Sequence, residues 1–198
     1  MLEHGLIERD VHRIGAEQEL FLMDRTWQPA PIIMDLLERI DDPRVVTELT
    51  RFNAEFNLAP ASFEGASLRR MEDQIDEALG IVREAANELG AEAVLTGILP
   101  PIRLADVDME NMTPKERYRQ LNDRLTRLRG SAYEFQIRGI DELLIRHDTV
   151  MLEGCNTSFQ VHFQVDPDSF ARYYNIAQAV TAPVLAAAVN SPLFFGRR

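Results

Sequence analysis

Polar and apolar residues alternate in three short segments of the chain, which is typical of strands that pack one face and leave the other polar. The segments are residues 13–22, 52–58 and 159–165. Their alternating polar members are Glu17 and Glu19, then Asn53, Glu55 and Asn57, then Gln160, His162 and Gln164. Carboxylates beside an imidazole and amides make a poor core, but they suit hard cations and a phosphorylated ligand. The pattern therefore predicts a sheet with one functional polar face.

The remaining pattern predicts helices between further strands. Apolar residues at helical spacing predict helices at about 32–40, 67–89, 113–128 and 169–189. In the third helix, Thr113 is a candidate cap and Pro114 a candidate first residue. Strands are expected at 45–50, which could join 52–58 as one bent strand, and at 93–99, whereas residues 133–147 are interpreted as irregular or partly helical. This mixture of helices and antiparallel-looking strand pairs favours an α+β fold.

Length and charge limit the classes of protein that fit. The 198 residues suit one domain, or one and a half, and 45% hydrophobic against 27% charged residues is ordinary for a globular protein. The net charge of −11 argues against a general nucleic-acid binder, which usually carries a basic stripe. An anionic ligand stays compatible with this charge, because bound divalent cations can dominate the local field.

Cysteine usage and the apolar segments indicate the compartment. Cys155 is the single cysteine, so the sequence has neither a disulfide framework nor a multi-cysteine zinc site. The first four residues resemble no signal peptide, and the longest apolar region, 177–189, is too short to span a bilayer. We therefore expect a cytoplasmic protein that binds no membrane.

Each candidate functional residue also has a purely structural interpretation. Glu17 and Glu19 could form a solvated strand edge, but the apolar residues around them favour burial, and buried carboxylates need a counter-charge such as a cation. Glu55 has the same two interpretations, and His162 could be a hydrogen-bonded structural residue or a ligand. Cys155 is more typical of a small packed residue than of a nucleophile. The glycines lack the spacing of a phosphate-binding loop, so a bound nucleotide would depend on metals and arginines.

At these residues the chain resembles the type 2 glutamate–cysteine ligases, also called carboxylate–amine ligases. Residues 15–19 resemble the Gly-x-Glu-x-Glu strand that opens this family. Further matches follow in the family's order along nearly the whole chain: Glu48 and Glu55 with Asn57, then Glu116-Arg117-Tyr118, then Gln160-Val161-His162, then Asn190-Ser191-Pro192.

The resemblance implies a glutamine-synthetase-like fold, in which a mostly antiparallel sheet forms a concave polar face backed by helices. It also implies that ATP phosphorylates a carboxylate, often the side chain of glutamate, and that an amine such as that of cysteine attacks the acyl phosphate. Mg²⁺ and ATP are then the expected cofactor and co-substrate, and the partners are small molecules. The resemblance implies that the metal ligands are Glu17, Glu19, Glu55 and His162. It implies that Gln160, His162 and Asn53 contact the nucleotide. Glu48 would lie near the substrate amine, and Arg197 or Arg198 would face phosphate or carboxylate.

The family's domain continues beyond the Asn190-Ser191-Pro192 turn. We therefore expect residues 1–198 to be the N-terminal portion of a single ligase-like catalytic domain, truncated at the C-terminus and with an incomplete site. An unpaired sheet edge would then favour homo-oligomers. Two alternatives stay open: a non-catalytic metal- or nucleotide-binding module of the same fold, and a metal-dependent amide or ester hydrolase. The hydrolase ranks last because the sequence contains no His-x-x-x-His pair.

Overall fold

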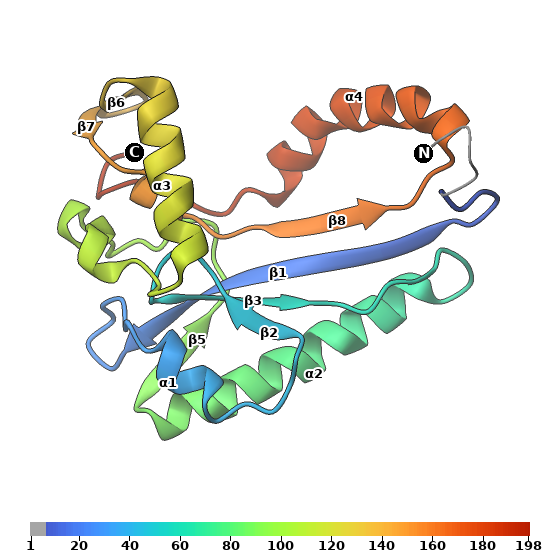
Figure 1. Cartoon of the computed structure of the whole chain (residues 1–198), viewed down its shortest axis with the longest axis horizontal. Coiled ribbons are helices and arrows are strands. Elements are labelled where there is room, and N and C mark those ends of the chain that lie inside the picture. Colours follow the sequence, from blue (N-terminus) through green and yellow to red (C-terminus); the bar gives the residue numbers. More distant parts are fainter. Residues whose placement is uncertain (1–6) are drawn as a thin grey trace.

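The computed structural model describes residues 7–198, and it places β1 (Arg13–Asp24) in the middle of a sheet (Figure 1). On one side β1 pairs with β3 (Asn53–Asn57) and with β4 (Ala61–Ser62). On the other side it pairs with β8 (Phe159–Phe163) and with β5 (Ala91–Val94). All of these pairings are antiparallel, so the α+β prediction is confirmed. The central place of β1 also confirms that its acidic pair does not lie on an exposed edge.

Two strands end the sheet. β2 (Val45–Thr47) pairs with the outer side of β3, and β8 closes the opposite side, where no other strand of residues 7–198 pairs with it. β2 is shorter than the expected strand 45–50. Beyond it, the chain bonds to the segment around Thr113: the Thr113 hydroxyl donates to the Glu48 carbonyl oxygen at 2.6 Å, and the Thr113 amide donates to Leu49 at 2.9 Å.

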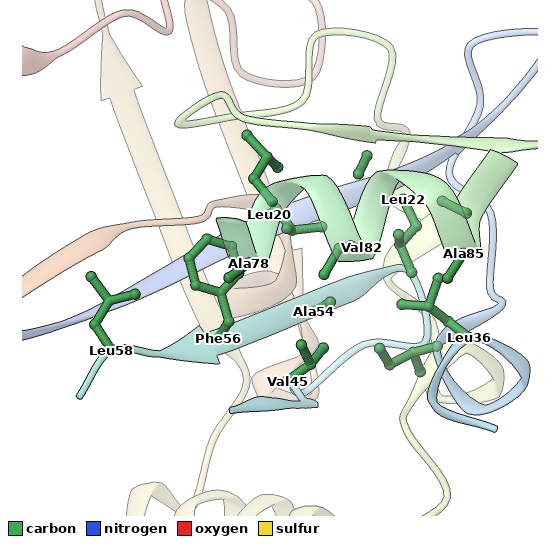
Figure 2. Close-up of a cluster of buried hydrophobic side chains, with 14 of the residues drawn as sticks. Leu20, Leu22, Leu36, Val45, Ala54, Phe56, Leu58, Ala78, Val82 and Ala85 are labelled. Atoms are coloured by element: carbon green, nitrogen blue, oxygen red, sulfur yellow. The ribbon is translucent and has the colours of Figure 1, made fainter. Parts of the chain in front are cut away.

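One face of the sheet packs against α2 (Ser67–Glu88). Leu20 and Leu22 of β1 and Ala54 and Phe56 of β3 lie on this face, where they meet Val82 of the helix (Figure 2). Each of these five side chains is fully shielded from solvent. Burying a large apolar side chain contributes about 1.5–3 kcal/mol, so this layer holds β1, β3 and α2 together.

The opposite face is covered only at one end of β1. Phe21 and Met23 pack there against residues of loops and short helices, such as Phe52, Leu99 and Met151. The 3-10 helix η4 (Val150–Cys155) is part of this cover. Its burial raises the pKa of the Cys155 thiol to about 12, which agrees with a packed cysteine. The polar part of the face therefore lies around Glu17 and Glu19, before the covered end of β1.

The segment 133–147 forms a hairpin, so the prediction of an irregular or helical segment was wrong. β6 (Tyr133–Arg138) and β7 (Glu142–His147) pair in register, with Phe135 opposite Ile145. The alternation of Tyr133, Phe135 and Ile137 marks the first strand. The second strand was hidden because the consecutive apolar residues 143–145 break the alternation.

The helix boundaries differ from the predictions at two places. α1 covers only Ile33–Leu37, and α3 runs over Glu116–Arg129 with Lys115 as its N-cap. Thr113 therefore does not cap α3, and Pro114 is not its first residue; the bonds of Thr113 to the end of β2 take that position out of the helix. At the other end, Gly130 adopts φ 70°, a left-handed conformation that suits glycine.

α4 (Phe170–Ala188) forms as predicted and runs beside β8 (Figure 1), but none of its residues is buried. In residues 7–198, no helix is both long enough and apolar enough to cross a bilayer.

Candidate functional site

The predicted polar face is assembled by the register of three strands. Glu19 lies directly opposite Glu55 of β3, and Glu17 lies between Asn57 of β3 and Gln160 of β8. Residues opposite one another in an antiparallel pair have Cβ atoms about 4.5–5.5 Å apart and point to the same face. Segments separated by more than a hundred residues thus bring their polar members together, as the alternation predicted.

Contacts from β8 fix the orientation of the two β1 glutamates. Oε2 of Glu19 accepts a hydrogen bond from the Ser158 amide at 2.8 Å, and Oε1 accepts one from Nε2 of Gln160 at 3.1 Å. Oε1 of Glu17 lies 3.4 Å from Nε2 of His162. These contacts leave the remaining lone pairs of both carboxylates available to a ligand.

Burial and neighbouring carboxylates raise the pKa values of Glu19 and Glu55. Burial, followed by the negative charge of Glu48, raises the pKa of Glu55 to about 7. Burial also raises the pKa of Glu19, with Glu48 again contributing. The ionised form of both groups is disfavoured because they are partly buried and the neighbouring charges are of the same sign; within residues 7–198, neither group forms an ion pair with a lysine or arginine. A bound cation would remove this cost.

Glu48 follows β2 and points to the same cluster. Its Oε2 accepts a hydrogen bond from the Leu49 amide at 3.0 Å. It lines a polar cavity of about 250 Å³, which also contains Glu19, Asn53 and Gln160 from the predicted set. The structure therefore gathers four of the predicted site residues around one hollow. Glu17, Glu55 and His162 do not line the cavity, although their strand positions place them on the same polar face.

The same cavity contains residues that the sequence analysis missed. Glu153, Gly154, Asn156 and Ser158 line it from η4 and the segment leading into β8. Gly154 is required by packing, since a Cβ there would overlap Cγ2 of Thr50. These residues belong to no periodic pattern; their signal was only their place directly before the histidine strand.

The Asn190-Ser191 turn bonds to the loop that precedes the site residues of β8. The Asn190 side chain accepts from the Gly97 amide at 3.0 Å, and the Ser191 hydroxyl accepts from the Ile98 amide at 2.7 Å. The carbonyl oxygen of Gly97 in turn accepts from the Thr157 amide at 2.8 Å. The turn thus fixes the loop that holds the start of β8.

The two terminal arginines lie elsewhere. The Arg198 backbone bonds to Asp141 in the turn of the β6–β7 hairpin, and Arg197 bonds to Phe194. Neither arginine lines the polar cavity. Their proposed contact with phosphate or carboxylate stays a prediction.

The donor set suits Mg²⁺ in its chemistry. Among residues 7–198, no three histidine, cysteine, aspartate or glutamate side chains are already positioned around one metal position. Mg²⁺ does not need such a cage, because it keeps several waters and is commonly held by one or two carboxylates together with substrate phosphates. The opposed Glu19 and Glu55, with Glu17 beside them, provide carboxylates of this kind.

Comparisons with known proteins support the resemblance. The family model described as glutamate-cysteine ligase family 2 (GCS2) matches residues 13–198. A protein of Rhodococcus jostii (strain RHA1) named "Putative glutamate--cysteine ligase 2-2" is 31% identical over 94 residues, which are 44% of this chain and 24% of that relative. The match therefore spans less than a quarter of the relative's length.

Proposed function

Because the chain belongs to glutamate–cysteine ligase family 2, we propose that it provides the nucleotide-binding half of a site that joins a carboxylate to an amine with ATP and Mg²⁺. The proposal includes a glutamine-synthetase-like fold, in which residues 1–198 are the N-terminal portion of one catalytic domain. Its substrates are small molecules: ATP, an acid such as glutamate and an amine such as cysteine.

One observation carries this proposal: three glutamates from two adjacent strands share a face, and the pKa of Glu55 is raised to about 7. Keeping three neighbouring carboxylates ionised is unfavourable in the absence of a cation. It becomes favourable when Mg²⁺ and a polyphosphate bind together. A structural role alone would favour apolar residues at these positions, as on the opposite face of the same strands.

The proposed reaction has two steps. The substrate carboxylate attacks the γ-phosphorus of ATP, and ADP leaves; the amine nitrogen then attacks the acyl carbon, phosphate leaves and an amide forms. Bound Mg²⁺ would neutralise phosphate oxygens and align the reacting groups.

The chain's own residues would hold and orient the reactants. Glu17, Glu19 and Glu55 would hold the cation, and the hydrogen bonds from the Ser158 amide and Gln160 keep Glu19 in place for it. His162 and Asn53 would contact phosphate oxygens, and Glu48 would accept a proton of the incoming ammonium group. Each of these roles is carried over from the family resemblance and from the shared face.

The first experiment is a calorimetric titration of Mg-ATP into the full chain, with magnesium-free ATP as the first control. We expect binding that requires Mg²⁺ and that is lost in the Glu17→Gln/Glu19→Gln double variant, because amides hold Mg²⁺ more weakly than carboxylates. The matched variant is Glu92→Gln, which replaces an exposed glutamate of β5 outside the site.

Three outcomes are decisive. Binding that survives in the double variant would contradict the proposed placement of the nucleotide. Binding without ADP release, in the presence of varied acids and amines and in a longer chain, would favour a non-catalytic module. Tightly held zinc or manganese without any response to ATP would favour the hydrolase.

A further inference from the structure

A second cavity opens from the polar one, and Glu48, Leu49, Glu153 and Asn156 line both. The second cavity has a volume of about 530 Å³, within the range of small-molecule sites. Its other lining residues are largely apolar or aromatic and come from α3, the β6–β7 hairpin, η4 and the C-terminal turn, among them Leu121, Leu125, Phe135, Leu152 and Phe194. The pair forms a bipartite site with carboxylates at the junction.

The junction selects for positive charge. Glu48 and Glu153 face both cavities, and neither lysine nor arginine of the described residues lines either one. Glu153 is an exposed residue of η4 whose side chain lines both cavities. An ammonium group with three N–H donors could be shared between two such carboxylates, and the charge on both partners strengthens these hydrogen bonds.

The polar cavity has a separate sign of a missing partner. Asn53 lines it, is only 3% exposed, and its Nδ2 has no acceptor among the described residues, while its Oδ1 accepts from the Thr50 hydroxyl. A buried donor without an acceptor is unfavourable. Under the proposed function, the phosphate oxygens of the acyl phosphate would lie at this end of the polar cavity and accept from Asn53.

We propose that the larger cavity binds the amine substrate, and that this amine carries an apolar or aromatic body with its ammonium group between Glu48 and Glu153. This inference rests on the proposed ligase function and changes its second substrate: an apolar amine without a carboxylate takes the place of cysteine. A small polar amine would leave the apolar walls exposed to water, and a carboxylate on the same body would be repelled at the junction.

The test compares three probes by calorimetric or NMR titration of the full chain without nucleotide. The probes are 2-phenylethylamine, ethanolamine, which has the ammonium group without the apolar body, and 3-phenylpropanoate, which has the body with the opposite charge. We expect the dissociation constant of 2-phenylethylamine to be at least about tenfold lower than that of either other probe.

Two variants separate the contributions of charge and apolar contact. Glu153→Gln should weaken 2-phenylethylamine binding about fivefold or more, since it removes one charged acceptor. Leu125→Asn should lower the affinity for 2-phenylethylamine but leave the affinity for ethanolamine unchanged. Both side chains are exposed, so the fold should persist, and Glu110→Gln is the matched control because Glu110 is exposed and lines neither cavity.

Equal binding of the three probes, or an unchanged affinity in Glu153→Gln, would overturn the inference. The separate Mg-ATP titration distinguishes it from the ligase proposal. A chain that binds Mg-ATP without preferring the apolar amine refutes only the amine site, whereas selective amine binding without Mg-ATP binding supports the site and refutes the ligase proposal.

Discussion

α2 and α4 are both long helices on the same side of the sheet, yet only one of them is integrated into a core. α2 buries residues such as Met71, Ala78 and Val82 against β1 and β3. α4 buries none, although it lies over Val161 and Phe163, which share the α2 side of the sheet with Ala16 and Ile14. A groove of about 630 Å³ separates α4 from β8.

The difference shows where the chain is stable and where its site is vulnerable. β1 and β3, which carry the three glutamates, are fixed by the α2 core. β8, which carries Gln160 and His162, has an exposed surface along its whole length. The candidate site therefore combines a rigid acidic half with a half that is held mainly by backbone pairing and by Glu19.

The largest expected effect is on the α2 side. Phe56→Ala should lower the free energy of unfolding by about 3–5 kcal/mol, because Phe56 is fully buried and its removal leaves a cavity. Leu185→Ala on α4 should change it by no more than about 0.5 kcal/mol, since Leu185 is 59% exposed. Urea unfolding followed by circular dichroism measures both. Similar losses in the two variants would show that α4 is packed as firmly as α2.

Gly154→Ala should have the next largest effect. The added methyl group would overlap Cγ2 of Thr50, so that η4 or Thr50 must shift, at a cost of about 1–3 kcal/mol. Gly80→Ala in α2 is the matched control. No atom outside its own helix turn lies within 4 Å of the added Cβ, so it should instead stabilise the protein by about 0.5–1 kcal/mol. A neutral Gly154→Ala would mean that η4 does not depend on this close contact.

Much of this comparison follows from local patterns, and some of it does not. The alternation around Glu17, Glu55 and His162 predicted the polar face, because a period of two is a property of each strand alone. The role of Glu153 was not predictable, since its position depends on how η4 packs on Thr50 rather than on any repeat. The exposure of α4 could not be predicted from the sequence either. An apolar stripe indicates that a helix can pack against another segment, but not which segment covers it.

The acidic half should also respond to pH in an unusual direction. The pKa of Glu55 in the folded state is about 7, above its ordinary value of 4.5, so the folded chain binds this proton more strongly than the unfolded chain does. Its contribution to stability is full below about pH 4.5 and is lost as the pH rises through about 7. The pKa of Glu19 is shifted in the same direction.

Urea unfolding between pH 4.5 and 8 tests this behaviour. Glu55→Gln should reduce the loss of stability with rising pH, without abolishing it, because Glu19 still titrates. Glu92→Gln should leave the slope unchanged, and millimolar Mg²⁺ should restore part of the stability at pH 8. A Glu55→Gln profile that parallels the unmodified chain would contradict the assignment.

The smallest effect on folding, but a visible one on assembly, is expected on the α4 side. The free edge of β8 carries no lysine, aspartate, glutamate or proline between Phe159 and Phe163, and such residues are the usual protection against edge-to-edge pairing. Exposed apolar residues of α4, such as Val184 and Leu185, extend the same surface. We therefore expect the chain to self-associate through β8 and α4. The sequence analysis predicted homo-oligomers from an unpaired sheet edge.

Light scattering over a range of protein concentrations measures this association. Val161→Lys on β8 and Val184→Glu on α4 should each shift the average mass toward the monomer while changing the free energy of unfolding by about 0.5 kcal/mol or less, because both side chains are exposed. Val46→Lys, at the other outer strand, tests which edge is used. A monomeric mass of the unmodified chain at high concentration, or dissociation only in Val46→Lys, would show that the exposed surface of β8 and α4 is not the site of contact. Loss of the oligomer in the first two variants alone would show that the exposed surface of β8 and α4 forms the contact between copies of the chain.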